Sequence, residues 1–406
     1  MKKLHEYAAL RSLKYPAFRY LWLSVFLWAA ANWMQRLAVS WLVLKETESP
    51  IAVSMVYAFN FMPNLFLGPF AGVILDRVNR KHMLVVIQLA AGLSCLAIAV
   101  AALMGSAHTW FILTMSGVFG VSVAFNIPTV PSMVFDIVEP QDALNANALR
   151  TIAFRIMGII GSAVGGVLVA VIGVGGTVLT SSVIFGLAAF NTALIRYQGP
   201  KREVARKSVM REMWEGFRYF SRNGAVGSMI VAAMFAEAFG FGMLALVPFF
   251  ANEGFLDVGS EGLGVMQGMV GLGGGIAGVF LATYGKQGRR GWLLVIGFVF
   301  YSVFVGIFGA SNIFALSMAM LLGFGLAAGL FDMTIVVLLQ ANVPQEMRGR
   351  VMGAWTLALG FGPVGALLLG LWGELWGVRV ALYIGSAILA AAAVALIATP
   401  WVRRLA

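Results

Sequence analysis

The stretch GPFAGVILDRVNRK, residues 68–81, shows how one long apolar segment of this chain ends. Gly68 and Gly72 are four residues apart, so they share a helix face that lets another helix approach closely. Asp76 ends the apolar run, and three basic residues follow it: Arg77, Arg80 and Lys81. Because the cytoplasmic loops of membrane proteins are rich in Lys and Arg, this pattern predicts a membrane-spanning helix that ends on the cytoplasmic side.

The composition of the whole chain agrees with a membrane protein. Of its 406 residues 60% are hydrophobic and 11% are charged, whereas a soluble domain carries roughly 25% charged residues. The low charge excludes a soluble enzyme and a disordered chain, and the single cysteine excludes a disulfide scaffold. The 48 glycines suit transmembrane helices that pack closely through small residues.

Apolar stretches long enough to cross ~30 Å of hydrocarbon recur along the sequence. The twelve predicted spans are 18–44, 51–75, 83–104, 109–135, 144–172, 175–196, 225–250, 263–284, 292–310, 313–339, 351–372 and 379–400. These runs are too long for the strands of a membrane barrel, and they do not alternate between apolar and polar residues. The spans are therefore expected to be helices.

The formal net charge of +11 is distributed so that it predicts an orientation. Basic residues concentrate at both termini and in the loops after the second, sixth, eighth and tenth spans, whereas the other loops hold mainly acidic charges. The positive-inside rule therefore predicts a multi-pass protein of the cell membrane with both termini cytoplasmic. No basic patch interleaved with aromatic residues occurs on a soluble segment, so we expect no nucleic-acid partner.

A polar stretch, residues 197–224, separates the first six spans (1–196) from the last six (225–406). Part of this stretch has apolar residues at helical spacing opposite charged ones, which predicts an amphipathic linker helix at the membrane surface; its apolar residues are Met213, Trp214, Phe217 and Phe220.

The two halves also share sequence. VEPQD at Val138–Asp142 matches NVPQE at Asn342–Glu346, in the corresponding loop of each half. Duplicated halves with a site between them are a common design among transporters. The sequence thus predicts an all-α membrane protein with twelve transmembrane helices in two pseudo-symmetric six-helix bundles.

Residues 68–81 resemble the signature loop of the major facilitator superfamily, with matching residues at Gly68, Gly72, Asp76, Arg77, Arg80 and Lys81. The resemblance implies a gating role, in which the aspartate engages a helix N-terminus and partners on the other half and stabilises the outward-open state. The alternative is an ordinary positively charged turn. Ala282 stands in place of the aspartate in the second half, so we expect no latch there.

The fifth span carries a second resemblance, to the antiporter motif of the same superfamily. Its small residues are Gly158, Gly161, Ser162, Gly165 and Gly166, with Ser162 where that motif usually has proline. We expect these residues to pack the fifth helix closely. Stretches such as Phe18–Trp22, Asn145–Leu149 and Pro344–Val351 resemble the enterobactin-exporter and macrolide-efflux branch.

Ionisable residues inside a membrane are costly and usually functional. Glu237 lies in the middle of the seventh span, Asp332 in the tenth, Arg155 in the fifth, and Arg36 in the first beside the polar residues Asn32 and Gln35. The resemblance implies that spans one, four, seven and ten line a central cavity. We hypothesise that Glu237 or Asp332 carries the coupling proton. The alternative is structural ion pairs, such as Glu237 with Arg36 or Asp332 with Arg155.

The sequence contains no motif that indicates catalysis. The three histidines fall at a terminus or in loops, and neither metal-ligand spacing nor a nucleophile motif occurs. We therefore expect no enzyme activity, metal or cofactor. The prediction is a monomeric transporter that exports amphipathic, drug-like or siderophore-like small molecules by alternating access with proton antiport. The alternatives are a proton-coupled uptake symporter and a lipid or lysolipid flippase of the same fold.

Overall fold

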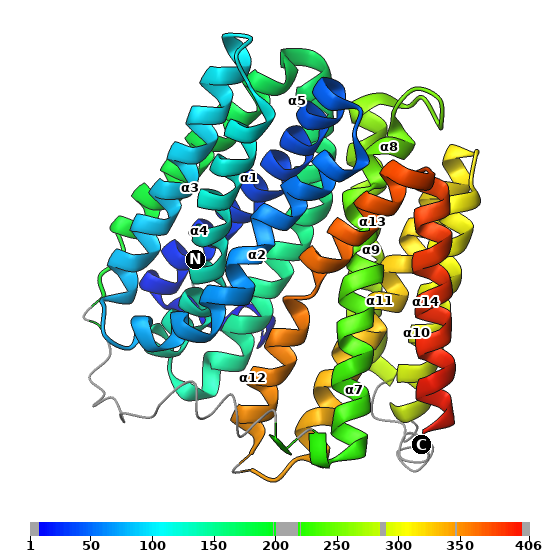
Figure 1. Ribbon diagram of the computed structural model, residues 1–406. Coiled ribbons are helices and arrows are strands. Elements are labelled where there is room, and N and C mark those ends of the chain that lie inside the picture. The colour runs from blue at the N-terminus through cyan, green and yellow to red at the C-terminus, as the bar shows by residue number, and fades with distance from the viewer. Residues whose placement is uncertain are drawn as a thin grey trace. The chain divides into compact units, whose positions relative to one another are not determined.

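The computed structural model describes residues 8–197, 199, 218–219, 221–284, 290–345 and 347–399, and all regular structure within those ranges is helical (Figure 1). The helices of the first half are η2 (Ala8–Lys14), α1 (Pro16–Thr47), α2 (Pro50–Leu75), α3 (Arg80–Leu103), α4 (Thr109–Ile137), η3 (Pro140–Asp142) and α5 (Ala143–Ala193). The second half has α7 (Gly224–Phe235), η4 (Ala236–Gly240), η5 (Phe241–Ala245), α8 (Val247–Ala251), α9 (Gly259–Tyr284), α10 (Arg290–Ala310), α11 (Phe314–Asn342), α12 (Arg348–Leu359), α13 (Gly362–Trp376) and α14 (Val378–Ala398). The predicted linker helix around Met213–Phe220 lies almost entirely outside the described residues.

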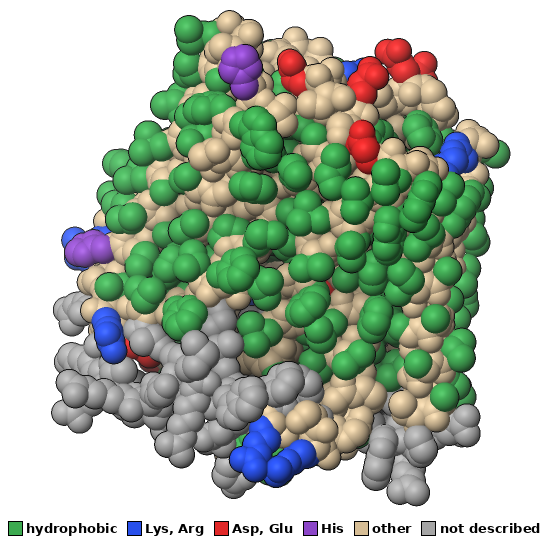
Figure 2. Space-filling model, viewed as in Figure 1, with side chains coloured by type: hydrophobic (Ala, Val, Ile, Leu, Met, Phe, Trp, Pro, Cys, Tyr) green, Lys and Arg blue, Asp and Glu red, His purple; other side chains and the backbone are tan. Residues whose placement is uncertain are grey.

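The helices have the length and the surface of membrane spans. Ten segments of the described chain are long and apolar enough to cross a membrane. One of them contains α5, whose 51 residues comprise two helices joined at Gly173, where φ is 75°. The 32 residues of α1 also reach across ~30 Å of hydrocarbon, so the helices are consistent with twelve spans. Hydrophobic side chains cover most of the helix surfaces in view, and charged ones gather near the helix ends (Figure 2).

The chain divides into two compact units. Unit 1 comprises residues 1–42 and 59–206, and unit 2 comprises residues 43–58 and 207–406. In unit 1, aromatic rings pack between α1, α4 and α5: the Trp28 ring centroid lies 6.2 Å from that of Phe119 and 4.9 Å from that of Phe185. A closed set of buried hydrogen bonds joins Ser24, Gln88 and Thr192, so α1, α3 and α5 are held by polar as well as apolar contacts.

Unit 2 relies on backbone contact at glycines. A Cβ atom at Gly273 would lie 2.1 Å from the carbonyl oxygen of Leu322, and one at Gly325 would lie 2.1 Å from that of Val270. No side chain fits at either position, so α9 and α11 approach as closely as two helices can. The glycine-rich run at 273–278 is thus a helix-packing surface.

The first third of α2, up to Ala58, belongs to unit 2, where it packs against α13. A Cβ atom at Gly370 would lie 2.5 Å from Ser54 Oγ, and Ser49 Oγ donates to Glu374 Oε2 at 2.7 Å. Close packing in the membrane and a hydrogen bond at the helix ends therefore attach residues 43–58 to this unit.

Candidate functional site

The helix of the seventh span is interrupted at Glu237. The α-helix α7 ends at Phe235, residues 236–240 form a π-helical turn, and residues 241–245 form a 3₁₀ turn before α8. Glu237 is only 9% exposed. Short π-helical segments inside α-helices occur frequently at functional sites, because they reposition side chains that a regular helix would direct elsewhere.

Close contacts with other helices surround the interrupted segment. A Cβ atom at Gly365 of α13 would lie 1.8 Å from the carbonyl oxygen of Ala238, and one at Gly240 would lie 2.4 Å from the ring of Tyr301. The interrupted segment therefore lies directly against the α13 backbone and the Tyr301 side chain.

Glu237 and Asp332, the two alternative carriers predicted from the sequence, interact with each other in unit 2. The two carboxylates are within electrostatic range, and Asp332 is half-buried on α11. The Tyr301 hydroxyl donates to the Ala236 carbonyl oxygen at 3.4 Å and is in electrostatic range of both carboxylates. The Tyr57 hydroxyl lies near the backbone of Glu237. A Cβ atom at Gly362 would be 3.4 Å from this hydroxyl and 3.7 Å from the Glu237 carbonyl oxygen.

Unit 1 holds the two arginines predicted inside the membrane. The Arg36 guanidinium lies 4.9 Å from the ring centroid of Trp33 and 4.8 Å from that of Phe61, so aromatic rings of α1 and α2 both contact it. Arg155 is half-buried on α5. Stacking on aromatic rings stabilises a cation where water is scarce.

The polar neighbours Asn32 and Gln35 are buried in α1, at 6% and 0% exposure. Within the part of the chain that the structure describes, the Gln35 side-chain amide and Trp33 Nε1 make no hydrogen bond.

The small residues of the fifth span face α1. A Cβ atom at Gly158 would lie 3.3 Å from the indole of Trp33, one at Gly161 would lie 3.2 Å from the Ala30 carbonyl oxygen, and one at Gly165 would lie 3.0 Å from Met34 Cα. Gly166 and Ser162 are also buried. Ser162 Oγ has no hydrogen-bond partner among the described residues.

Residues 68–81 comprise the end of α2, the turn at 76–79 and the start of α3, and they contain an ionic network. Arg80 donates to Asp136 Oδ2 at 2.7 Å and to Asp76 Oδ1 at 3.3 Å, so one guanidinium joins the loop to the end of α4. The Asn79 side chain accepts from the backbone N–H groups of Lys81 and His82 and caps α3.

The other residues of this loop are more open. Arg77 is exposed and Lys81 is half-buried. A Cβ atom at Gly68 would lie 3.2 Å from Asn64 Oδ1 of the same helix, and one at Gly72 would meet nothing within 4 Å among the described residues. The helix contact expected at these two glycines stays a prediction.

Asp136 and its second partner, Tyr197, were not predicted from the sequence. Tyr197, which follows α5, donates its hydroxyl to Asp136 Oδ2 at 2.5 Å. Burial and this hydrogen bond raise the pKa of Tyr197, so the phenol stays protonated and remains a donor. Asp136 therefore links the quoted loop to the start of the linker.

A second cluster of charged and polar side chains, which was not predicted from the sequence, surrounds the buried Asp142. Its carboxylate accepts from Arg11 Nε at 2.8 Å, Lys14 Nζ at 2.7 Å and Tyr15 Oη at 2.9 Å. The hydrogen bond to Asp142 raises the pKa of Lys14. These contacts hold η2 against the α4–α5 connection. In the sequence, only the repeat of Val138–Asp142 at Asn342–Glu346 drew attention to this region.

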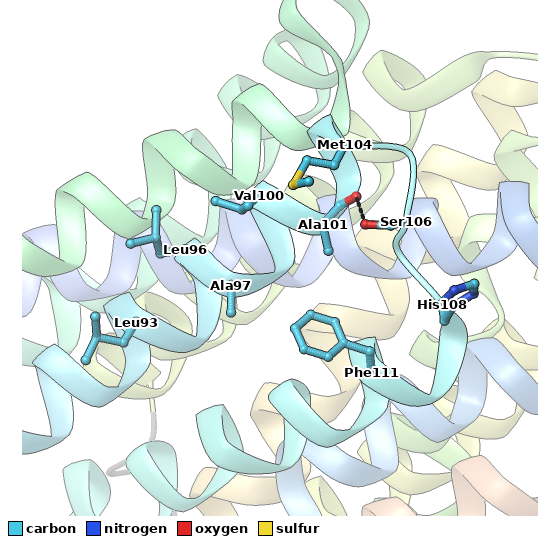
Figure 3. Close-up of a pocket in the computed structure, with 9 residues that line it drawn as sticks. All are labelled: Leu93, Leu96, Ala97, Val100, Ala101, Met104, Ser106, His108 and Phe111. Atoms are coloured by element: carbon cyan, nitrogen blue, oxygen red, sulfur yellow. Dashed lines mark hydrogen bonds between the residues drawn. The ribbon is translucent and has the colours of Figure 1, made fainter.

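An apolar groove lies between the end of α3 and the start of α4, and none of these residues lines it (Figure 3). Its volume is about 550 Å³, and its lining is apolar except for Ser106 and His108. Leu93 and Met104 at its rim are 64% and 74% exposed. The groove is part of the hydrophobic helix surface and brings no charged group to a ligand.

The known proteins that resemble this chain match it over nearly its whole length. A family model described as a transmembrane secretion effector matches residues 7–403. The staphyloferrin A transporter of Staphylococcus aureus is 22% identical over 367 residues, covering 89% of this chain and 90% of its own. The enterobactin exporter EntS of Shigella flexneri is 22% identical over 364 residues, covering 88% and 85%. The crystal structure of the nucleoside transporter NupG has the same fold, with a TM-score of 0.75 at 13% identity, covering 94% of this chain and 98% of that one.

Proposed function

Because the chain belongs to the transmembrane secretion effector family of major facilitator transporters, we propose that it exports amphipathic small molecules by alternating access in exchange for protons. The relatives named for staphyloferrin A and enterobactin support a siderophore-like or drug-like substrate. The positive-inside pattern supports a place in the cell membrane with both termini cytoplasmic, and we propose that the monomer is the working unit.

The observation that supports proton coupling is the pair formed by the buried Glu237, in the interrupted seventh span, and the half-buried Asp332 of α11. Glu237 and Asp332 lie within electrostatic range in a low-dielectric part of unit 2, where two like charges disfavour each other. Such a pair exchanges a proton with only a small change in its surroundings. We assign the coupling proton to this pair, with Glu237 as the carrier and Asp332 as the group that modulates it.

We further propose that the network of Asp76, Arg80 and Asp136 gates the transport cycle. The Arg80 guanidinium joins the ends of α2 and α4 within unit 1. A change in the partners of Asp76 would therefore alter how the loop at 76–79 is held. The small residues Gly158, Gly161 and Gly165 then act as the close-packed support of α5 on α1.

Transport by Glu237→Gln in proteoliposomes tests the carrier. We expect accumulation of the fluorescent anion 1-pyrenebutyrate, driven by a pH gradient, to fall to the level of empty vesicles. Exchange of 1-pyrenebutyrate across the membrane without a gradient should persist, because alternating access does not require net proton movement.

The matched control is Glu261→Gln, which neutralises an exposed glutamate at the start of α9 in the same unit. It should accumulate the probe as the wild type does. Full gradient-driven accumulation by Glu237→Gln would remove the carrier role. Loss of both accumulation and exchange, in a variant that elutes as a monodisperse protein, would show that Glu237 has a structural role instead.

A further inference from the structure

Two spans of unit 2 are interrupted, and the two interruptions contact each other. The seventh span leaves the α-helical form at residues 236–245, and the eleventh span breaks between α12 and α13 (Figure 1). A Cβ atom at Gly365 would lie 1.8 Å from the Ala238 carbonyl oxygen, and one at Gly242 would lie 2.8 Å from the backbone nitrogen of the residue after Gly365. The breaks therefore meet backbone to backbone, and we call residues 236–245 and 360–366 the joint.

Both breaks lack the regular hydrogen bonds that keep an α-helix straight. In the seventh span the Phe241 N–H donates to the Ala236 carbonyl oxygen, five residues back, and Pro248 follows in the first turn of α8. In the eleventh span the Phe361 N–H donates only three residues back, and Pro363 follows in the first turn of α13. Prolines and π-helical turns are the usual places where helices bend.

The part of the eleventh span beyond the joint is firmly held. A Cβ atom at Gly370 would lie 2.5 Å from Ser54 Oγ, and one at Gly373 would lie 3.0 Å from Pro50 Cβ, so α13 is in close contact with α2 as well as with the turn of the seventh span. Such contacts leave little space for displacement. We call α8 and α13 the outer arms.

The inner arms, α7 and α12, begin after the loops that are predicted to be cytoplasmic, and they pack against each other. Ala354 and Ala358 lie in the buried face of α12, so the side chains there are small. A Cβ atom at Gly353, in the middle of α12, would meet nothing within 4 Å among the described residues. The inner arms thus have space to move that α13 does not have.

Glu237 is the one titratable residue in the sequence of the joint. Its turn packs against α7, η5, α10, α13 and α14, and neither α7 nor η5 contains a titratable side chain. The titratable side chains near the turn or on the other helices packed against it include Asp332, Tyr301, Tyr57, Arg379 and Tyr383. Of these, Asp332 is the acidic residue within electrostatic range of Glu237.

We propose that the joint is a hinge of unit 2, about which α7 and α12 bend together when Glu237 loses its charge. Glu237 precedes Ala238, so a change around its carboxylate acts directly on the turn that contacts Gly365. Two neighbouring carboxylates disfavour each other, and neutralising Glu237 removes this repulsion from Asp332. The inference rests on the proposed function, because there the coupling proton neutralises Glu237.

Distances between spin labels test the hinge in the full chain, in nanodiscs, with Cys95→Ala as the background. Labels on cysteines at Arg222, just before α7, and at Gly353 of α12 are each paired with a label at the exposed Trp292, at the start of the unbroken α10. Each inner arm has 12 residues and is about 18 Å long, so a change in bend of about 20° moves its end by about 6 Å. We expect Glu237→Gln, which imitates the protonated carboxyl group, to shift both distances by about 3–6 Å.

Two further label pairs and one variant serve as controls. Labels at Leu375 of α13 and at Val380 of α14, each paired with Trp292, report on an outer arm and on an unbroken helix, and both residues are exposed. Their distances should not change in Glu237→Gln. Glu261→Gln, which neutralises an exposed glutamate at the start of α9, should leave all four distances as in the wild type.

Pro363→Ala tests whether the two arms share the hinge. The variant supplies an N–H donor to the eleventh span alone, yet it should reduce the shift that Glu237→Gln causes in both inner arms. Pro128→Ala, in α4 of unit 1, is the matched control and should leave both shifts complete. An unchanged distance between Trp292 and Val380 verifies that Pro363→Ala folds; if it does not fold, Glu237→Gln alone decides.

A shift in one inner arm only, in neither, or equally in the α13 pair would overturn the hinge. So would a folded Pro363→Ala variant in which both shifts stay complete or only that of α12 falls. The accumulation assay separates the hinge from the proposed function. Full gradient-driven accumulation by Glu237→Gln, with shifted distances, refutes the carrier role alone, whereas lost accumulation with unshifted distances refutes the hinge alone.

Discussion

Gly365 of α13 has no side chain, and α13 therefore approaches the interrupted part of the seventh span closely. A Cβ atom there would lie 1.8 Å from the Ala238 carbonyl oxygen, so the α13 backbone touches the turn that carries Glu237. The position of this carboxylate therefore depends on a residue more than one hundred positions away in the sequence.

We expect Gly365→Ala to lower the free energy of unfolding by about 1–3 kcal/mol, the usual cost of overpacking. Thermal unfolding of the purified protein in detergent measures this. Gly275→Ala is the control, because a Cβ atom at Gly275 would meet nothing within 4 Å among the described residues and alanine favours helix. Equal melting temperatures for the two variants would contradict the close contact at Gly365.

The ionisable residues of the candidate site could be predicted because charge is conspicuous in an apolar span. Glu237, Asp332, Arg36 and Arg155 were found in that way. Their grouping could not be predicted: that Glu237 interacts with Asp332, and that Tyr301 lies beside both, depends on the packing of distant helices. Tyrosines are ordinary in membrane helices, so nothing in the sequence distinguishes Tyr301.

At the scale of the element, hydropathy predicted the spans closely. The predicted spans 51–75 and 109–135 became α2 at Pro50–Leu75 and α4 at Thr109–Ile137. The interruptions within the seventh and eleventh spans were not predicted. A hydropathy profile averages over about 19 residues, so it does not detect a change of helix type.

The division of the fifth and sixth spans was predicted, and Gly173 accounts for it. With φ of 75° and ψ of 172° this residue occupies a region that is nearly restricted to glycine. Gly173→Ala should therefore cost about 1–3 kcal/mol of stability. Gly186→Ala, in the same helix with open space around it, should cost nothing. Equal thermal stability of the two variants would show that the chain does not need a glycine conformation at this turn.

At the scale of the whole molecule, the family, the helical fold and the membrane follow from composition and from the order of the motifs. The family model matches residues 7–403, so the resemblance first seen in residues 68–81 holds for nearly the whole chain. The substrate could not be read from the sequence, because recognition depends on which side chains of different helices face the same space. The contact of Arg36 with Trp33 of α1 and Phe61 of α2 is one such case.

We propose that export is driven by proton exchange at Glu237 and Asp332. Proton movement in inside-out vesicles with an acidified lumen measures this exchange, with a panel of dyes, antibiotics, siderophores and lysolipids as substrates. We predict that at least one amphipathic substrate releases protons from the lumen in vesicles carrying the wild type, and that vesicles carrying Glu237→Gln give no response. If no substrate of the panel moves protons, or if Glu237→Gln responds as the wild type does, proton exchange at this pair does not drive export.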